Sequence, residues 1–274
     1  MIGCPLMCNY CPQDNLRDGY GKVDDKYMSL DTFKRALDGI DVSVRIDFSG
    51  MAEAWVNPEA SKMLEYALQR GHRVAIYTTL YNWSREDVDA VAELMTSYTD
   101  QFEVFSIHYP DNLGNMKGWK YSEDWEYALR VMQSVCQLTG IKTEGMTMSG
   151  EGEVHPALAH LGIRLWNWRG HDRAGSLDLG QVKEQAVQIA PKHSIPIRCG
   201  KTPRYDQNVV LPNGDVVLCC MDYDRKHILG NLCNNTMEEI RRQEPFKNLL
   251  MENARGEFST NSLCRTCTDA VAQK

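Results

Sequence analysis

The sequence predicts an α/β fold with a parallel sheet, followed by a small α+β domain built around a β-hairpin. Two observations lead to this prediction. Between residues 30 and 170, apolar runs of strand length alternate with amphipathic stretches of helix length, which is typical of parallel βαβ units. Beyond residue 176 the alternation stops, and two strand-like runs flank the turn sequence Pro212-Asn213-Gly214. The 274 residues, 43% hydrophobic and 24% charged, suit one large domain or a medium domain with a small one.

The expected helices are bounded by residues that commonly cap helices. Ser84 precedes one of them, with Asp87 in the position of a capping box, and Gly140 follows another. In the alternating region, helices are expected at residues 30–39, 58–70, 84–98 and 121–139. Strands are expected there at residues 44–48, 73–78, 102–107, 142–148 and 163–168. In the C-terminal region, strands are expected at 208–211 and 215–220, and helices at 236–243 and 245–254.

Composition and charge argue against several classes of protein. The formal net charge is −7 and no basic run or basic–aromatic stripe is present, so nucleic acid is not expected as a partner. No stretch of eighteen apolar residues occurs, so no membrane span is expected. No export signal precedes Cys4, and nine of the ten cysteines gather near the two ends of the chain. This distribution favours metal binding in the cytoplasm over disulfides in a secreted protein.

The first cysteine group consists of Cys4, Cys8 and Cys11, with the spacing C-x3-C-x2-C. Three thiolates on one loop can bind three irons of a [4Fe-4S] cluster. The fourth iron then has no protein ligand, and an open iron can bind a small molecule and pass it an electron. A zinc site or a set of separate thiols is the alternative, but zinc usually takes four ligands and no fourth lies close by in the sequence.

This spacing, with Tyr10 directly before the third cysteine, resembles that of the radical S-adenosylmethionine (radical SAM) enzymes. The resemblance implies a partial (β/α)6 TIM-like barrel whose first strand runs into the cysteine loop. Because only three residues precede Cys4, we expect that first strand to be truncated. In the family, SAM binds the open iron and is cleaved reductively. The product is a 5′-deoxyadenosyl radical, which abstracts a hydrogen atom from the substrate.

Further residues are assigned by the same resemblance. The segment Met51-Ala52-Glu53 resembles the family's Gly-Gly-Glu motif, in which the carboxylate binds the amino group of SAM. Polar residues at the ends of barrel strands contact SAM in the family. Arg173 lies in a segment that resembles the family's Arg-Ala-Gly-Asn. The cofactor contacts expected are Tyr10, Glu53, Thr78 and Ser106, and the substrate contacts expected are His108 and Arg173. Structural roles stay open as alternatives for the same residues. Glu53 would then be a solvated surface residue, Ser106 would bond its own backbone, His108 would be structural and Arg173 would anchor the domain junction.

The second cysteine group lies near the C-terminus. Its pattern resembles the twitch domain, the shortened form of the SPASM domain, in which four cysteines hold one auxiliary [4Fe-4S] cluster. The expected ligands are Cys199, Cys219, Cys264 and Cys267. A structural zinc at the same four residues is the alternative. The resemblance divides the chain into a barrel at 1–178, a linker at 179–198 and an auxiliary domain at 199–274, and it leaves Cys136, Cys220 and Cys233 without a role.

The leading functional hypothesis is a radical SAM oxidoreductase with two [4Fe-4S] clusters and SAM as cofactors. Its substrate is expected to be a peptide or protein residue, with dehydrogenation of a small polar molecule, a sugar or aminocyclitol, as the alternative. The electron donor expected is a flavodoxin or a ferredoxin. Outside enzymes, a non-catalytic two-cluster electron carrier and a degenerate homologue both stay open, because fold-level analogy is a weak argument for function.

Overall fold

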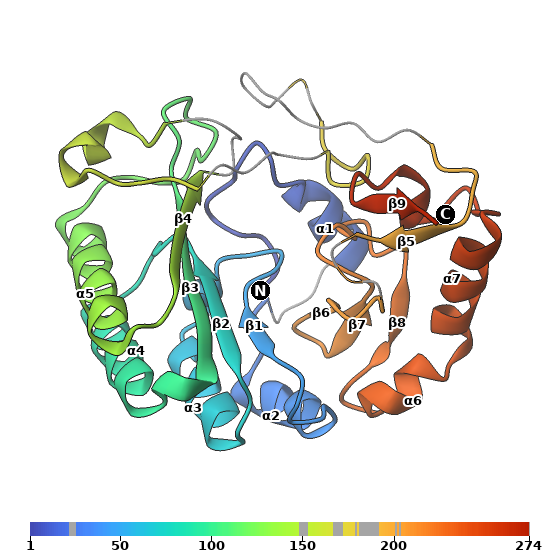
Figure 1. Cartoon of the computed structure of the whole chain (residues 1–274), viewed down its shortest axis with the longest axis horizontal. Coiled ribbons are helices and arrows are strands. Elements are labelled where there is room, and N and C mark those ends of the chain that lie inside the picture. The colour runs from blue at the N-terminus through green and yellow to red at the C-terminus, as the bar shows by residue number, and fades with distance from the viewer. Residues whose placement is uncertain are drawn as a thin grey trace.

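The computed structural model describes residues 1–21, 26–147, 153–166, 172–178, 180, 192–200, 202 and 204–273. Its N-terminal part is organised around a four-stranded parallel sheet with the strand order β1-β2-β3-β4 (Figure 1). The strands are β1 Ile46–Phe48, β2 Val74–Thr78, β3 Phe102–Tyr109 and β4 Thr143–Thr147. All four were expected from the sequence, each at bounds within about three residues of those observed.

The helices between residues 30 and 139 lie along one face of the sheet, whereas the helix at residues 13–20 lies on its other side, next to the C-terminal part (Figure 1). Ser84 caps α4 with a complete capping box that includes Asp87, as expected, and Ser122 caps α5. Gly140 ends α5 in the left-handed conformation that glycine adopts without strain. The helices are α1 Gln13–Tyr20, α2 Leu30–Asp38, α3 Ala60–Gln69, α4 Arg85–Ser97 and α5 Glu123–Thr139. Short 3-10 helices occupy Ala54–Val56, Thr99–Gln101 and Pro156–Leu161.

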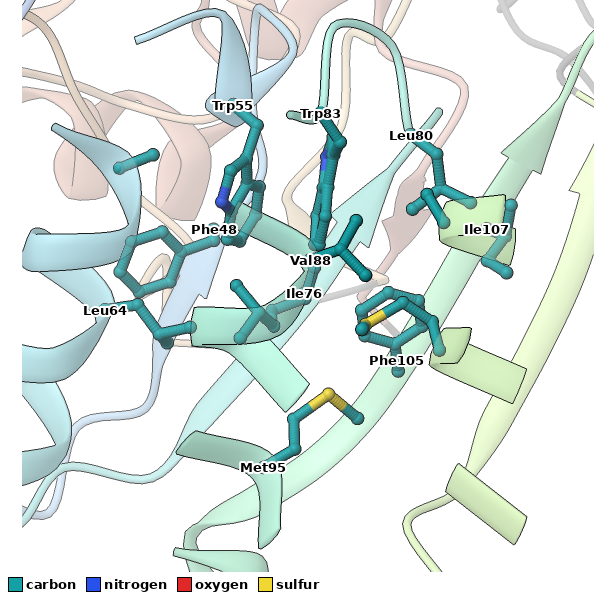
Figure 2. Close-up of a cluster of buried hydrophobic side chains, with 14 of the residues drawn as sticks. Phe48, Trp55, Leu64, Ile76, Leu80, Trp83, Val88, Met95, Phe105 and Ile107 are labelled. Atoms are coloured by element: carbon teal, nitrogen blue, oxygen red, sulfur yellow. The ribbon is translucent and has the colours of Figure 1, made fainter. Parts of the chain in front are cut away.

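The main hydrophobic core fills the space between the sheet and these helices (Figure 2). Phe48, Ile76 and Phe105 are register partners on β1, β2 and β3, so their side chains share the helix-facing side of the sheet. Trp55 and Trp83 extend this layer, with ring centroids 4.2 Å apart. Burial of such large aromatic side chains supplies much of the free energy that fixes the sheet against its helices.

The opposite face of the sheet carries polar side chains. Tyr77 on β2, Ser106 on β3 and Glu144 on β4 are register partners. Ile76 and Phe105, which directly precede the first two, point toward the helices. Because side chains alternate along a strand, this row points away from the helices and toward the middle of the molecule. The sheet therefore has one apolar face for stability and one polar face that is available for chemistry.

The described residues of one expected strand form no strand, and one helix was not expected. Residues 163–166 of the expected strand 163–168 form no strand, and residues 167 and 168 lie outside the described residues. The segment still runs beside β4, because Trp166 N donates a hydrogen bond to Gly145 O. A single hydrogen bond does not form a strand pair. Gly162, four residues before Trp166, has a left-handed conformation and changes the direction of the chain there. Helix α1 was not expected, because its eight residues carry one apolar anchor, Leu16.

The C-terminal part contains two small antiparallel sheets. The expected hairpin is present, with β6 Val209–Val210 paired to β7 Asp215–Val217 around a turn in which Gly214 has a φ of 88°. A third strand, β8 Ile228–Asn231, pairs with β7 and was not expected. The other sheet joins β5 Ile197–Cys199 to β9 Ala270–Ala272. Helices α6 Met237–Arg241 and α7 Glu244–Arg255 and the 3-10 turn Leu263–Thr266 complete this part.

The two parts are in direct contact. A small buried cluster combines Ile2, Leu16 and Met51 from the N-terminal part with Val217 and Tyr223 from the C-terminal part. Helix α1 therefore serves as the surface on which the C-terminal part is seated. Within the described residues, no helix has the length and apolar character needed to cross a membrane.

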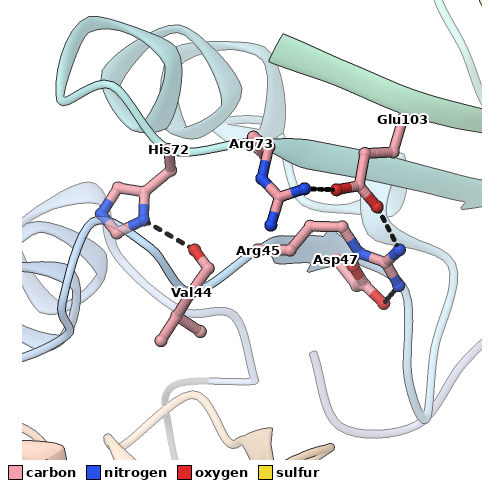
Figure 3. A network of polar contacts seen from close by, with 6 residues as sticks. All are labelled: Val44, Arg45, Asp47, His72, Arg73 and Glu103. Carbon is pink, nitrogen blue, oxygen red and sulfur yellow. Dashed lines mark hydrogen bonds and ion pairs between the residues drawn. The ribbon is translucent and has the colours of Figure 1, made fainter.

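An ion-pair network ties together the N-terminal ends of three strands (Figure 3). Arg45 Nε lies 2.6 Å from an Asp47 oxygen, and Arg45 Nη1 lies 2.6 Å from Glu103 Oε2. Arg73 forms an ion pair with the other oxygen of Glu103. Hydrogen bonding from Arg45 is the main cause that lowers the pKa of Glu103 below its ordinary value. The network helps to hold β1, β2 and β3 in register.

We expect Glu103→Gln to lower the free energy of unfolding at pH 7 by about 0.5–1 kcal/mol, a modest value because these groups are partly exposed. The pKa of Glu103 is lowered in the folded state, so its stabilisation is present above the unfolded pKa of about 4.3 and is lost as pH falls through the folded pKa. Urea unfolding at pH 7 and pH 3 should show the difference between the two proteins shrink. Glu93→Gln, at an exposed position on α4, is the control.

Candidate functional site

The first cysteine loop lies at the C-terminal ends of the parallel strands, where helix α1 begins. Gln13, the first residue of α1, holds the loop in place. Its Oε1 accepts a hydrogen bond from Cys4 N at 3.1 Å, and its Nε2 donates to Cys11 Sγ at 3.3 Å and also to Met51 O. One side chain thus joins two of the three cysteines to the Met51-Ala52-Glu53 segment.

The thiols of this loop are close enough to influence one another. Burial is the largest cause that raises the pKa values of Cys4 and Cys8, and negative charge on Cys11 raises both further. The Glu53 backbone forms a hydrogen bond with Cys4 that acts in the opposite direction. Desolvated thiols that repel one another as thiolates are stabilised by a bound cationic centre, so this donor set fits an iron–sulfur cluster.

The carboxylate of Glu53 is buried, with 5% of the residue exposed. Oε1 accepts a hydrogen bond from Thr78 Oγ1 at 2.7 Å, and Oε2 accepts from Thr79 N and Thr79 Oγ1, both at 2.7 Å. The structure therefore brings together two of the sequence-predicted cofactor contacts, Glu53 and Thr78, by bonding them to each other. Oε1 accepts one of these bonds and keeps capacity for another donor. Ala52 has a negative φ, so alanine in place of the motif's second glycine causes no backbone strain.

Ser106 and His108 follow each other on the polar face of β3. Ser106 is fully buried, and its Oγ has no hydrogen-bond partner among the described residues. Burial, together with the charge of Arg173, lowers the pKa of His108 to about 4, so its imidazole is neutral at pH 7. A neutral imidazole can accept a proton or a hydrogen bond at one nitrogen and donate from the other.

Arg173 fastens the cysteine loop from the side of the C-terminal part. Its Nε donates to the Tyr10 carbonyl at 3.3 Å, and its guanidinium carbon lies 5.9 Å from the centre of the Tyr223 ring. Arg173 and Ala174 both have positive φ, at 52° and 54°, which is costly for residues with a side chain. These contacts fit the anchor interpretation of Arg173, and its contact with substrate stays a prediction.

The four C-terminal cysteines expected as ligands line a single cavity of about 30 Å³, together with apolar residues such as Ile197 and Leu263. The four are Cys199, Cys219, Cys264 and Cys267. Burial, followed by the charge of Cys267, raises the pKa of Cys264 to about 12. None of the ten cysteines forms a disulfide. Four thiols around one apolar cavity suit a cluster whose irons are each bound by one cysteine.

Among the described residues, no three His, Cys, Asp or Glu side chains converge closely enough to hold one metal ion. In a [4Fe-4S] cluster each thiolate binds a different iron, so the thiols surround a volume and do not meet at a point. A tetrahedral zinc site would require its ligands to meet at one ion. The arrangement of the cysteines around a cavity is compatible with the cluster.

Residues 199–268 match the family model of SPASM, an iron-sulfur cluster-binding domain. Three of the solved structures that match share the fold over 90–93% of this chain. BtrN in complex with AdoMet and 2-DOIA matches with a TM-score of 0.55 and 16% identity, over 93% of this chain and 84% of BtrN. Native anSMEcpe with bound AdoMet and the Kp18Cys peptide matches with a TM-score of 0.54 and 12% identity, over 93% of this chain and 81% of anSMEcpe. Native anSMEcpe with bound AdoMet matches with a TM-score of 0.51 and 13% identity, over 90% of this chain and 79% of anSMEcpe.

The chain shares its fold with BtrN and anSMEcpe, and its residues 199–268, called the SPASM domain below, match that family model. No curated protein sequence matches it. The SPASM match begins at Cys199 and includes all four cysteines that line the 30 Å³ cavity.

Cys219 and Cys220 face different surroundings in the SPASM domain. Cys219 lines the small cavity, whereas Cys220 lines a much larger one of about 940 Å³. The larger cavity runs along β1, contacts Arg45 and Asp47, and reaches Glu53. The two adjacent cysteines, which follow the end of β7, therefore line separate cavities.

Sequence reasoning missed the residues that hold the cysteine loop in place. Besides Gln13, Asn115 accepts hydrogen bonds from Asn9 N at 2.8 Å and from Asn9 Nδ2 at 3.1 Å. The hydroxyl oxygen of Tyr223, in the SPASM domain, lies 3.0 Å from Cys11 Sγ. For Gln13 and Tyr223, the one signal that could have indicated this role is closeness to a cysteine in the sequence. Gln13 lies two residues after Cys11, and Tyr223 lies four residues after Cys219. Asn115 carries no such signal.

We expect Gly118→Ala to displace the first cysteine loop. An added Cβ would lie 2.3 Å from Pro5 O and 2.8 Å from Leu6 Cα, both backbone atoms between Cys4 and Cys8. The overpacking should cost about 1–3 kcal/mol of unfolding free energy and should lower the iron bound by the first loop. Iron analysis after anaerobic reconstitution measures this. Gly140→Ala destabilises a helix end far from the loop and should keep the full iron content; equal iron loss in both variants would contradict the prediction.

Proposed function

We propose that this chain is a radical SAM oxidoreductase with two [4Fe-4S] clusters. Cys4, Cys8 and Cys11 would hold the first cluster, and the four cysteines of the SPASM domain would hold the auxiliary one. The observation that carries the proposal is the joint geometry of the two groups: three cysteines on one loop that Gln13 holds in place, and four thiols around one cavity. When bound, the first cluster would supply the electron that cleaves SAM, and SAM the radical that removes a hydrogen atom from the substrate.

In this proposal the protein's own groups bind and orient SAM beside the first loop. Glu53 is held by Thr78 and Thr79 with one oxygen able to accept a further donor, which suits the ammonium of SAM. The hydroxyl of Ser106, buried on the same side of the sheet as His108, is available to a polar group of the cofactor. The neutral imidazole of His108 would contact the substrate. Arg173 would act by holding the loop at Tyr10.

We propose further that the four-stranded parallel sheet belongs to a partial (β/α)6 barrel formed by residues 1–178, with 179–198 as a linker and 199–274 as the auxiliary domain. The order β1-β2-β3-β4, with helices on one face, supports this assignment. The position of Glu53, Thr78 and Ser106 at or near the C-terminal ends of the strands also supports it, because active sites of such barrels gather at that end.

The substrate proposed first is a residue of a peptide or protein. The support is that anSMEcpe, which shares this fold, has been solved with AdoMet together with the Kp18Cys peptide and with the Cp18Cys peptide. A small polar molecule, a sugar or an aminocyclitol, is the second candidate. Its support is that BtrN, solved with AdoMet and 2-DOIA, has the highest TM-score of the structures compared above, 0.55. A flavodoxin or ferredoxin would deliver the electron.

The test is anaerobic reconstitution with iron and sulfide, followed by dithionite and SAM. About eight irons per chain, steady release of 5′-deoxyadenosine and its acceleration by peptides would support the first proposal. Acceleration by aminocyclitols or sugars alone would support the second. Two clusters without SAM cleavage would instead identify an electron carrier or a degenerate homologue, and zinc in place of iron would overturn the proposal.

A further inference from the structure

Three consecutive residues of the SPASM domain contact the segment that contains Cys11 and helix α1. The Tyr223 hydroxyl lies 3.0 Å from Cys11 Sγ. Asp224 Oδ1 accepts a hydrogen bond from Asn15 Nδ2 at 2.7 Å, and Arg225 Nη1 donates to Gly19 O at 2.7 Å. This run begins only four residues after Cys219, which lines the auxiliary cavity. The loop 219–225 therefore links the two cysteine groups directly.

The loop is held firmly on both sides. Asp222 N donates to Cys219 O at 3.1 Å, which closes a turn directly after the auxiliary cysteine. Met221 is buried in the core of the SPASM domain, whereas Tyr223 is buried against Leu16 and Met51 of the N-terminal part. Because alternate residues are packed into different cores, a shift of Tyr223 relative to either cysteine group would disrupt packing.

Tyr223 is the donor when Cys11 binds iron. A metal-bound thiolate carries no proton, whereas a phenol keeps its own, so the bond runs from the Tyr223 hydroxyl to Cys11 Sγ. Tyr223 is 1% exposed, and water does not compete for the bond. Gln13 Nε2 is a second donor to the same sulfur at 3.3 Å. Tyr223 and Gln13 thus place two donors at the sulfur of Cys11.

We propose that Tyr223 is a positioning residue by which the SPASM domain sets the reduction potential of the first cluster. Hydrogen bonds to cluster sulfurs are among the factors that set this potential. A donor on a ligand thiolate stabilises the more negative, reduced cluster, so it makes that cluster easier to reduce. Through this contact, seating of the SPASM domain on α1 makes the first cluster ready to accept an electron. The inference rests on the proposed function, since it requires a cluster at the first loop.

The test compares Tyr223→Phe with the wild type in redox titrations followed by electron paramagnetic resonance, without SAM or substrate. Loss of the hydroxyl should shift the first-cluster midpoint potential to a more negative value. The expected size is about tenfold in the reduction equilibrium, or about 59 mV for one electron. The auxiliary cluster should keep its potential. Tyr66→Phe removes a hydroxyl bonded to Asp38 at 3.1 Å, far from either cysteine group, and should change neither potential.

Asn15→Ala separates the hydrogen bond from general loosening of the interface. It removes the contact to Asp224 and leaves both donors to Cys11 in place, so it should not reproduce the shift. If Tyr223→Phe folds but loses the first cluster while Asn15→Ala keeps it, Tyr223 serves to retain the cluster, and its assignment to the reduction potential is overturned. An unchanged potential in Tyr223→Phe, or an equal effect in Asn15→Ala, would overturn the inference and leave the proposed function standing. A wild type without a first cluster would overturn both.

Discussion

Replacement of Cys4, Cys8 and Cys11 by alanine is expected to abolish SAM cleavage and to lower the iron content from about eight to about four atoms per chain. The three cysteines lie on one loop, and Gln13 bonds two of them, so they are expected to act as one site. The auxiliary cysteines line a separate cavity in the SPASM domain and should keep their iron. The measurements are iron per chain and 5′-deoxyadenosine formed with dithionite and SAM.

Cys136→Ala is the matched control for the triple variant. This cysteine is buried in α5, lines neither cavity, and behaves as a small apolar residue in the core. It should keep both clusters and the cleavage rate. Retention of about eight irons by the triple variant would show that the first loop is not a cluster site.

Glu53→Gln is expected to weaken SAM binding at least tenfold and Glu53→Ala to unfold the strand ends around it. Charge-assisted hydrogen bonds contribute about 1.5–3 kcal/mol each, and about 1.4 kcal/mol corresponds to tenfold in affinity. In the alanine variant, Thr78 Oγ1, Thr79 N and Thr79 Oγ1 lose their acceptor in a buried site. Two or more unsatisfied donors should cost about 2–5 kcal/mol of unfolding free energy.

Equilibrium dialysis of SAM under anaerobic conditions and urea unfolding measure these two effects separately. Glu59→Gln is the control, because Glu59 accepts a single backbone hydrogen bond, from Leu30 N at 2.9 Å, outside the site. Unchanged SAM affinity in Glu53→Gln, with the fold intact, would show that this carboxylate is purely structural.

The parallel sheet, its helices and the hairpin could be predicted from the sequence because local signals agree with the tertiary structure there. Ser84 with Asp87, and Gly140, mark helix ends by backbone hydrogen bonding that needs no distant partner. The same holds for Gly214, whose positive φ suits the turn it occupies. The cysteine groups were visible because ligand spacing is itself a local property.

Contacts made between distant segments could not be predicted. Tyr223 and Cys11 are 212 residues apart, and nothing in either local sequence indicates the other. Arg173, expected to contact substrate, bonds Tyr10 from 163 residues away. In the described part of the expected strand, residues 163–166, the opposite holds: the apolar pattern is local, but the segment forms no ladder with β4 and Trp166 N bonds Gly145 O.

The position of β1 has a consequence for how the protein behaves in concentrated solution. Within the described part of the chain β1 pairs with β2 alone, so the backbone groups along its other edge face the 940 Å³ cavity. An unpaired strand edge is a template on which another chain can add a strand. Here the strand is only three residues long, and Arg45 and Asp47 place opposite charges beside it. Short length and charge protect this edge, so replacement of Asp47 by an uncharged residue would remove part of the protection against self-association.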